Sequence, residues 1–197
     1  MKLRDRIGVD LGRRVSLEEG VDWALANNVK YIDAQLDITP NGLMDFDEAR
    51  CKPIREKAGE NEIHLGLHTL SGVNIAEYSP FLSDAIDAYL KAYIDVAMRL
   101  RAEWIVVHPG HHFGDKEARM EAAIRHIAKA LRYAEDVGAL LYLENMNWEP
   151  DLAEVHYLGH TIEEAKIYFE RLTSPNLKWS FTINHAHLVP DGIDGFI

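Results

Sequence analysis

Several strand-like segments of the sequence end on side chains that commonly bind metal ions. His68 ends HLGLH, His108 ends WIVVH and Glu144 ends LLYLE, while His185 follows a segment at 177–183. Imidazole nitrogens and carboxylate oxygens are common ligands of zinc, manganese, iron and cobalt. We therefore predict a divalent-metal site built from these four residues, with zinc or manganese favoured and iron or cobalt as alternatives.

Glu144 is the strongest member of this metal set. A carboxylate that ends an apolar strand needs a cation or several hydrogen-bond donors to stay charged there. A salt bridge to arginine or lysine is the alternative for Glu144, and capping or hydrogen bonding is the alternative for any single histidine. Four such groups at successive equivalent positions favour metal binding over four separate structural roles.

Other polar or aromatic side chains lie near the same strand ends and could contact a substrate. Asp33 and Gln35 end the second strand two residues apart, on the same side of it, and one of them could bind a sugar hydroxyl. Trp148 could form an apolar wall for a sugar ring, although plain packing is the alternative. The glycine-containing loop HPGHHFG supplies two more candidates, for which solvated loop histidines are the alternative. The predicted substrate-binding residues are Gln35, His111, His112, Trp148 and Asn184.

Three further histidines are not candidates for the site. His64 opens the third strand at its opposite end, so we expect a structural role for it. His126 lies within a helical stretch, and His160 precedes one.

Six strand-like segments alternate with helical stretches along the chain. We expect strands at 7–11, 31–36, 63–68, 104–108, 140–144 and 177–183, and helices at 17–27, 45–58, 84–101, 116–137 and 162–172. Ser16 and Glu19 form a capping box at the start of the first helix. The strands lack a clean polar/apolar alternation, which is typical of parallel strands covered on both faces. The pattern therefore indicates repeated βα units.

Such units build either an open, doubly wound sheet or a closed barrel, and periodicity does not distinguish the two. Open sheets often carry a glycine-rich phosphate loop, but neither GxGxxG nor GxxxxGK[ST] is present. Polar groups instead end nearly every strand, which is the barrel arrangement. We predict a fold of the (β/α)8 TIM-barrel type, with about six of its eight βα units in one domain, 1–197, that is truncated at its C-terminus.

The charge balance disfavours some partners. Lys and Arg total 21 against 32 Asp and Glu, so the formal charge of −11 repels nucleic acid and anionic membranes. The single cysteine, Cys51, cannot form an internal disulfide, and we find neither a signal peptide nor a long apolar span. We therefore expect a cytoplasmic protein that acts on a small molecule.

The motifs GLHTL, VVHPG, YLENM and FTINHAH around the four predicted ligands resemble, in order and spacing, the xylose isomerase-like TIM-barrel superfamily. That superfamily contains sugar and sugar-phosphate isomerases and epimerases, and type-two apurinic endonucleases. The resemblance implies that His68, His108, Glu144 and His185 are metal ligands. The family's sixth-strand pattern is usually Asp-x-x-His, but this chain has Thr182 in place of the aspartate, and Thr182 cannot replace a charged ligand. Family ligands on the seventh and eighth strands have no counterpart in these 197 residues.

Three functions are open at this point. The first is a metal-dependent sugar or sugar-phosphate isomerase or epimerase, in which Glu144 is the catalytic carboxylate that holds the metal. Its reaction would be a proton transfer through a metal-stabilised enediolate. The second is an apurinic endonuclease-like phosphodiesterase, which the acidic charge opposes. The third is a non-catalytic barrel fragment that forms a homodimer to cover its exposed strand edges.

Overall fold

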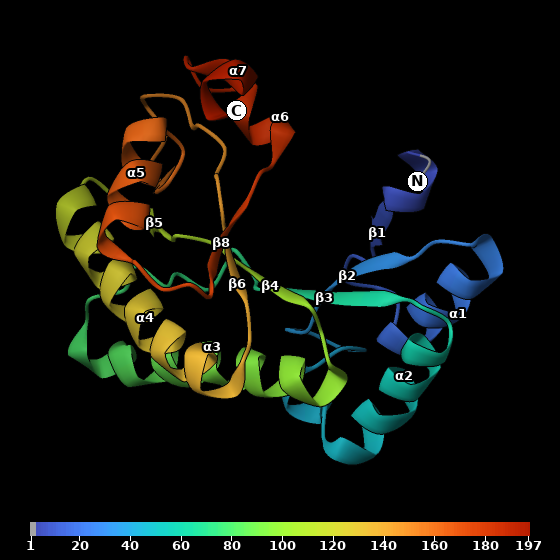
Figure 1. Cartoon of the computed structure of the whole chain (residues 1–197). Helices are drawn as coiled ribbons and strands as arrows, with labels where there is room; N and C mark the ends of the chain where they lie inside the picture. The colour runs from blue at the N-terminus through green and yellow to red at the C-terminus, as the bar shows by residue number, and fades with distance from the viewer. Residues whose placement is uncertain (1–2) are drawn as a thin grey trace. The chain divides into compact units, whose positions relative to one another are not determined.

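The computed structural model of the chain describes residues 3–197 (Figure 1). It contains two compact units. The first unit runs up to Leu70 and includes Lys91–Ile105; the second unit consists of Ser71–Leu90 and Val106–Ile197. Each unit carries its own part of the predicted βα pattern, so each is described by itself.

Three parallel strands and two helices form most of the first unit. Strand β1 (Gly8–Asp10) pairs with β2 (Tyr31–Gln35), and β2 pairs with β3 (His64–His68). Helices α1 (Leu17–Asn27) and α2 (Glu48–Glu60) contact each other, and they also contact β2 and β3 respectively (Figure 1). The register places Gln35 opposite His68. The predicted βα order is therefore confirmed, with two strand ends side by side.

The starts of these two helices follow from their capping residues. The predicted capping box is confirmed, because Ser16 and Glu19 each accept a hydrogen bond from the other's backbone N–H. The predicted start of the second helix at residue 45 is wrong by three residues. A 3-10 turn (Leu43–Asp45) comes first, and Asp47 then caps α2 by accepting from the Arg50 backbone N–H at 2.9 Å.

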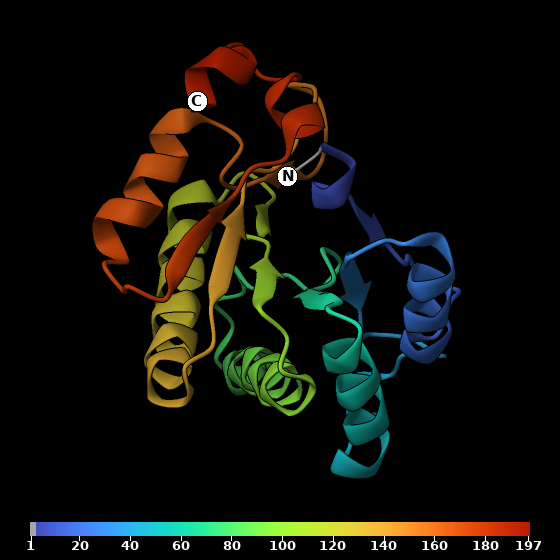
Figure 2. The ribbon, with the colours of Figure 1, turned by 45° about the vertical axis from the view of Figure 1, so that its right-hand side comes forward.

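The second unit contains the last two predicted βα strands. Strand β6 (Leu141–Glu144) pairs in parallel with β8 (Leu177–Ser180), and the two lie side by side in orange and red in Figure 2. Helix α4 (Lys116–Val137) precedes β6, and helix α5 (Ile162–Arg171) precedes β8. Because Glu144 pairs with Ser180, the residues after Ser180 continue beside the end of β6.

Two elements belong partly to each unit. Helix α3 (Pro80–Leu100) begins four residues before its predicted start, and proline is favoured in a first helical turn because it has no N–H to satisfy. Strand β4 (Trp104–Val107) covers all but the last residue of the predicted fourth strand. His108 therefore lies directly after a strand.

The structure also has short elements that the sequence did not reveal. Strand β5 (His111–His112) pairs in antiparallel fashion with β7 (His156–Tyr157). The strand expected at 177–183 ends at Ser180, because Thr182 is the N-cap residue of a one-turn helix, α6 (Ile183–Ala186). Helix α7 (Gly192–Phe196) follows, and a 3-10 turn (Leu3–Arg6) precedes β1. His185 is thus a helical residue beyond the strand end.

Burial agrees with the interpretation of covered strands. The three inner residues of β3 and the last three of β4 are buried, as are three of the four residues of β6. Helix α4 buries a stripe at three- and four-residue spacing that includes Ile124, Ile127, Leu131 and Ala134. Among residues 3–197, no helix is long and apolar enough to cross a membrane.

Candidate metal centre

The side chain of Glu144 lies in a buried, polar corner of the second unit. It is 5% exposed at the end of β6. Its Oε2 atom lies 3.1 Å from Nε2 of His108, which is 7% exposed. Its Oε1 atom accepts a hydrogen bond from the Thr182 hydroxyl. The hydroxyl hydrogen bond holds this buried carboxylate in one orientation, with Oε2 on the side of the His108 imidazole.

His185 lies beside the same carboxylate but is fixed by the backbone. Its Nδ1 lies 2.8 Å from the Asn145 carbonyl oxygen and 3.6 Å from Glu144 Oε1. A carbonyl oxygen can only accept, so Nδ1 carries the proton and Nε2 carries the lone pair. In this tautomer, Nε2 is the nitrogen of His185 that can bind a metal.

The loop that follows His108 is fixed by a close packing contact. Gly110 has a φ of 92°, and a Cβ at this position would lie 2.6 Å from the Ala76 Cβ and 2.7 Å from the Asn74 side-chain oxygen. That oxygen accepts from the His111 backbone N–H at 2.9 Å, and the Asn74 amide donates to the His111 carbonyl at 3.0 Å. Only glycine fits here, and Asn74 holds the backbone of His111, three residues after His108.

In the first unit, His68 is oriented by a carboxylate. Its Nδ1 lies 2.7 Å from Asp33 Oδ2, and Asp33 Oδ1 accepts from the Trp104 indole N–H at 3.0 Å. Gly66 makes room for this indole, because a Cβ there would lie within 2.3 Å of three Trp104 ring atoms. A carboxylate on the second nitrogen is typical of metal-binding histidines. The contact to Asp33 assigns the proton to Nδ1 and the lone pair to Nε2.

These donors suit a divalent transition metal. The second unit brings together His108, Glu144 and His185, and the first unit presents His68 at the end of β3. Imidazole nitrogens with one buried carboxylate and no thiolate fit zinc, manganese, iron or cobalt. The use of all four residues as one ligand set stays a prediction from the sequence.

Comparison with known proteins agrees with the strand-end arrangement. The family described as "Xylose isomerase-like TIM barrel" matches residues 21–195. The chain belongs to this family. No curated protein matches the sequence. The predicted TIM-barrel class is therefore confirmed at the level of the family, and the strand ends are the part of such a barrel where functional groups gather.

Solved structures of sugar epimerases share this fold. A D-tagatose 3-epimerase-like protein matches with a TM-score of 0.77 and 22% identity over 91% of this chain and 66% of its own. A D-psicose 3-epimerase from Clostridium cellulolyticum H10 matches with 0.79 and 16% identity over 95% and 67%. An L-ribulose 3-epimerase gives 0.73 and 15% over 93% and 62%. The chain thus spans about two thirds of the length of these proteins.

The predicted substrate residues of this barrel chain lie in different settings. Gln35 ends β2 and accepts from the Arg13 guanidinium at 3.2 Å, while Trp148 is 41% exposed in the loop after β6. Asn184 is exposed on α6. These three side chains are accessible from solvent to different degrees, and their contacts with a substrate stay predictions.

The two histidines after β4 differ from each other. The ring of His111 contacts the rings of Phe113 and Tyr157 edge-on, and burial lowers its pKa. The buried ring of His112 stacks on His156, and its Nδ1 accepts from the Gly114 backbone N–H at 3.1 Å. His112 is therefore packed into the β5–β7 pair, whereas half-buried His111 keeps part of its ring exposed to solvent.

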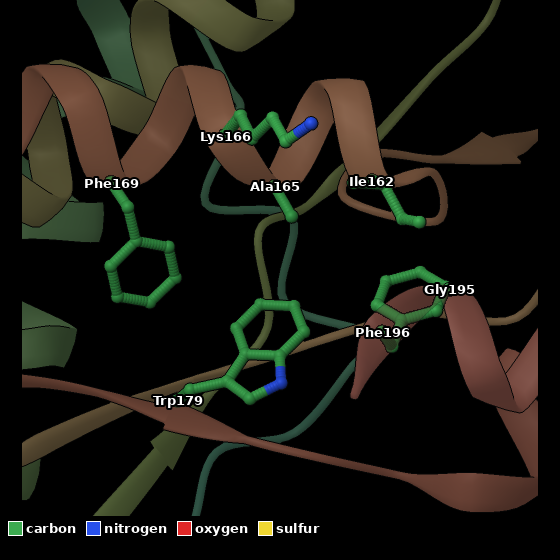
Figure 3. A pocket seen from close by; sticks show the side chains of 7 residues that line it. All are labelled: Ile162, Ala165, Lys166, Phe169, Trp179, Gly195 and Phe196. Carbon is green, nitrogen blue, oxygen red and sulfur yellow. The ribbon is translucent and has the colours of Figure 1, made fainter.

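An apolar pocket lies elsewhere in the second unit, between α5, β8 and α7. Figure 3 shows the rings of Phe169, Trp179 and Phe196 facing this space, and the Trp179 and Phe196 rings stack with centroids 6.1 Å apart. Lys166 is the one titratable side chain in its lining. The pocket carries no metal-binding group, so it is not the candidate centre. The lining residues are Ile162, Ala165, Lys166, Phe169, Trp179, Gly195 and Phe196.

Sequence reasoning missed the roles of three residues that contact a predicted ligand or its partner within their own unit. Asn145 adjoins the predicted ligand Glu144, and Trp104 opens a strand, but neither type signals a role by itself. Asp33 was noted only as a possible contact of a sugar. The available signal for Asp33 was its place near the end of the second strand, because parallel neighbouring strands bring their ends together and His68 ends the third strand.

Proposed function

We propose that this chain is a metal-dependent sugar or sugar-phosphate isomerase or epimerase-like protein that works by proton transfer. One observation carries the proposal: the buried Glu144 carboxylate faces His108 at 3.1 Å at the end of a strand in this barrel family. The structural likeness to two sugar 3-epimerases and a D-tagatose 3-epimerase-like protein supports a sugar as the substrate class. The acidic charge of −11 opposes a nucleic-acid substrate. The cytoplasm stays the predicted location.

The proposed site assigns separate tasks to the residues of this chain. His108 and Glu144 would hold the divalent ion, and the sequence prediction adds His68 and His185. Such an ion supplies Lewis-acid polarisation of a sugar carbonyl, which makes the adjacent C–H bond easier to deprotonate. Because burial lowers its pKa, the imidazole of His111 is neutral near pH 7 and can accept a hydrogen bond from a hydroxyl.

Metal analysis of matched glutamate variants tests the proposal. We expect the chain, purified without chelator, to contain stoichiometric zinc, manganese, iron or cobalt. Glu144→Gln removes the buried negative charge and should lower metal affinity at least about 100-fold. Glu103→Gln is the control, because Glu103 is an exposed glutamate that pairs with His64 at the start of β3. Its metal content should equal that of the wild type.

The reaction class has its own readout. We expect solvent deuterium to enter one of a panel of ketoses and aldoses when the metal-loaded chain is present, and Glu144→Gln to abolish the exchange. A chain that contains no metal, even after incubation with each ion, and exchanges no deuterium would overturn the proposal. Incision of an abasic-site duplex in place of exchange would favour the phosphodiesterase alternative.

A further inference from the structure

We infer that Thr182 and Asn145 are positioning residues that fix which oxygen of Glu144 faces His108, an inference that rests on the proposed metal site. Neither residue is assigned as a ligand. Two hydrogen bonds join the Asn145 side chain to the Thr182 backbone, and we call this pair of hydrogen bonds the Asn145–Thr182 clamp.

The clamp continues the β6–β8 pairing beyond the last paired residues. The Asn145 amide donates to the Thr182 carbonyl at 3.0 Å, and its side-chain oxygen accepts from the Thr182 N–H at 2.7 Å. The Asn145 N–H also donates to the Ser180 carbonyl at 3.3 Å. Asn145 is fully buried. A side-chain amide thus replaces the next strand pair and fixes the backbone of Thr182 against β6.

With its backbone held, Thr182 directs its hydroxyl at Glu144. The hydroxyl donates to Oε1, while Oε2 lies on the side of His108 Nε2. The two oxygens of one carboxylate therefore have different neighbours. A hydrogen bond of this kind removes the freedom of the carboxylate to rotate and exchange its oxygens, so Oε2 is presented toward His108 before any ion binds.

The same asparagine also orients a predicted ligand. The Asn145 carbonyl accepts from His185 Nδ1 at 2.8 Å, so the backbone of Asn145 sets the tautomer of His185 while its side chain sets the place of Thr182. One residue therefore couples the end of β6 to both Thr182 and His185. This explains a buried amide directly after Glu144, where an apolar residue would suit the core.

Threonine at position 182 gives the centre one negative charge fewer than an aspartate there would give. An aspartate at this position would place a second carboxylate against Glu144, whereas the hydroxyl is neutral and donates. Thr182 therefore stabilises a single ionised carboxylate in the second unit's part of the centre. Its role is exerted through Glu144 and not by contact with an ion.

Cobalt titration of the full chain tests this role of the hydroxyl. Thr182→Val keeps the shape of the side chain but removes the hydroxyl, and Thr182→Ser keeps the hydroxyl. We expect Thr182→Val to bind cobalt about 10- to 100-fold more weakly, with an altered visible absorption spectrum, and Thr182→Ser to restore both. Thr182→Ala supplies the same comparison in the event that the valine variant does not fold.

Thr161→Val is the matched control for loss of a structural hydroxyl. Thr161 caps α5 by accepting from the Glu164 N–H at 3.2 Å, so its variant should melt at a lower temperature with unchanged cobalt affinity and spectrum. Wild-type-like affinity and spectrum in Thr182→Val, or weakening that Thr182→Ser does not reverse, would overturn the positioning role and leave the proposed function standing. Failure of the wild type to bind cobalt would overturn both.

Discussion

His126 and His185 belong to the same unit, and each has Nδ1 beside an oxygen atom, but the surroundings of their Nε2 atoms differ. His126 is 1% exposed within α4, with Nδ1 2.7 Å from Asp87 Oδ1 and Nε2 3.1 Å from the Glu77 carbonyl. His185 has its Nδ1 on a carbonyl, and no hydrogen bond to its Nε2 occurs among residues 3–197. Protein oxygens engage both nitrogens of His126, so it can only cross-link its neighbours.

A carboxylate partner does not by itself distinguish the two kinds of histidine. His68 and His126 both place Nδ1 2.7 Å from an aspartate oxygen. His68, however, ends a strand of a parallel sheet, where the family gathers its functional groups, whereas His126 faces the preceding helix. The position on the element distinguishes His68 from His126, and the partner of the second nitrogen distinguishes His185 from His126.

Removal of His126 should have the largest effect on folding. His126→Ala leaves Asp87 and the Glu77 carbonyl without this buried donor, which we expect to cost about 3 kcal/mol in the free energy of unfolding. Urea denaturation measures this cost, and metal analysis should show unchanged metal content in the folded protein. His64→Ala is the control with a partly exposed histidine and should cost less than about 1 kcal/mol. Loss of metal in His126→Ala would remove the distinction between the two kinds of histidine.

A change in the partner of His68 should have an intermediate effect. Asp33→Asn can present an N–H to Nδ1 of His68, which would move the ring proton to Nε2 and disfavour metal binding. We expect about a 10-fold loss of metal affinity by isothermal calorimetry, with little change in stability. Asp87→Asn, beside His126, is the matched variant and should leave metal affinity unchanged. Equal affinity losses in both variants would show that Asp33 has no special link to the metal.

The sequence predicted the type and order of the long elements and the bounds of two long helices, but it did not predict the short elements. Helices α1 and α4 have their predicted bounds, because a capping box begins one and Gly138, at a φ of 82°, ends the other. The β5–β7 pair has two residues per strand, too few for any periodicity, and α6 is a single turn. The residues at the ends of the longer strands were predictable, because identifying them requires only the position where each strand stops.

The surroundings of those strand ends were not predictable, for a physical reason. Asn145 binds the backbone of Thr182, 37 residues away, and Trp104 reaches Asp33 across 71 residues. An amide or an indole pairs with any suitable oxygen, so its type does not identify its partner. Thr182 was noticed only as a departure from a motif, and its hydrogen bond to Glu144 requires the fold.

The stacked pair of His112 and His156 provides the smallest expected effect, and it represents a third kind of histidine. Burial, followed by His156 and Lys116, lowers the pKa of His112 below its usual 6.5, with Glu164 and Asp115 acting in the opposite direction. His112 therefore binds a proton at a higher pH in the unfolded chain than in the folded chain. The contribution of neutral His112 to the free energy of unfolding is fully present above pH 6.5 and is lost as the pH falls below it.

Melting temperatures between pH 8 and pH 5 test this linkage. His112→Asn can keep an acceptor for the Gly114 N–H but does not titrate, so we expect its melting temperature to fall less on acidification than that of the wild type. His187→Asn, at an exposed position, is the control and should behave like the wild type. If His112→Asn shows the wild-type pH dependence, the stacked pair does not contribute to acid sensitivity. A smaller dependence would show that His112 must stay neutral to pack against His156.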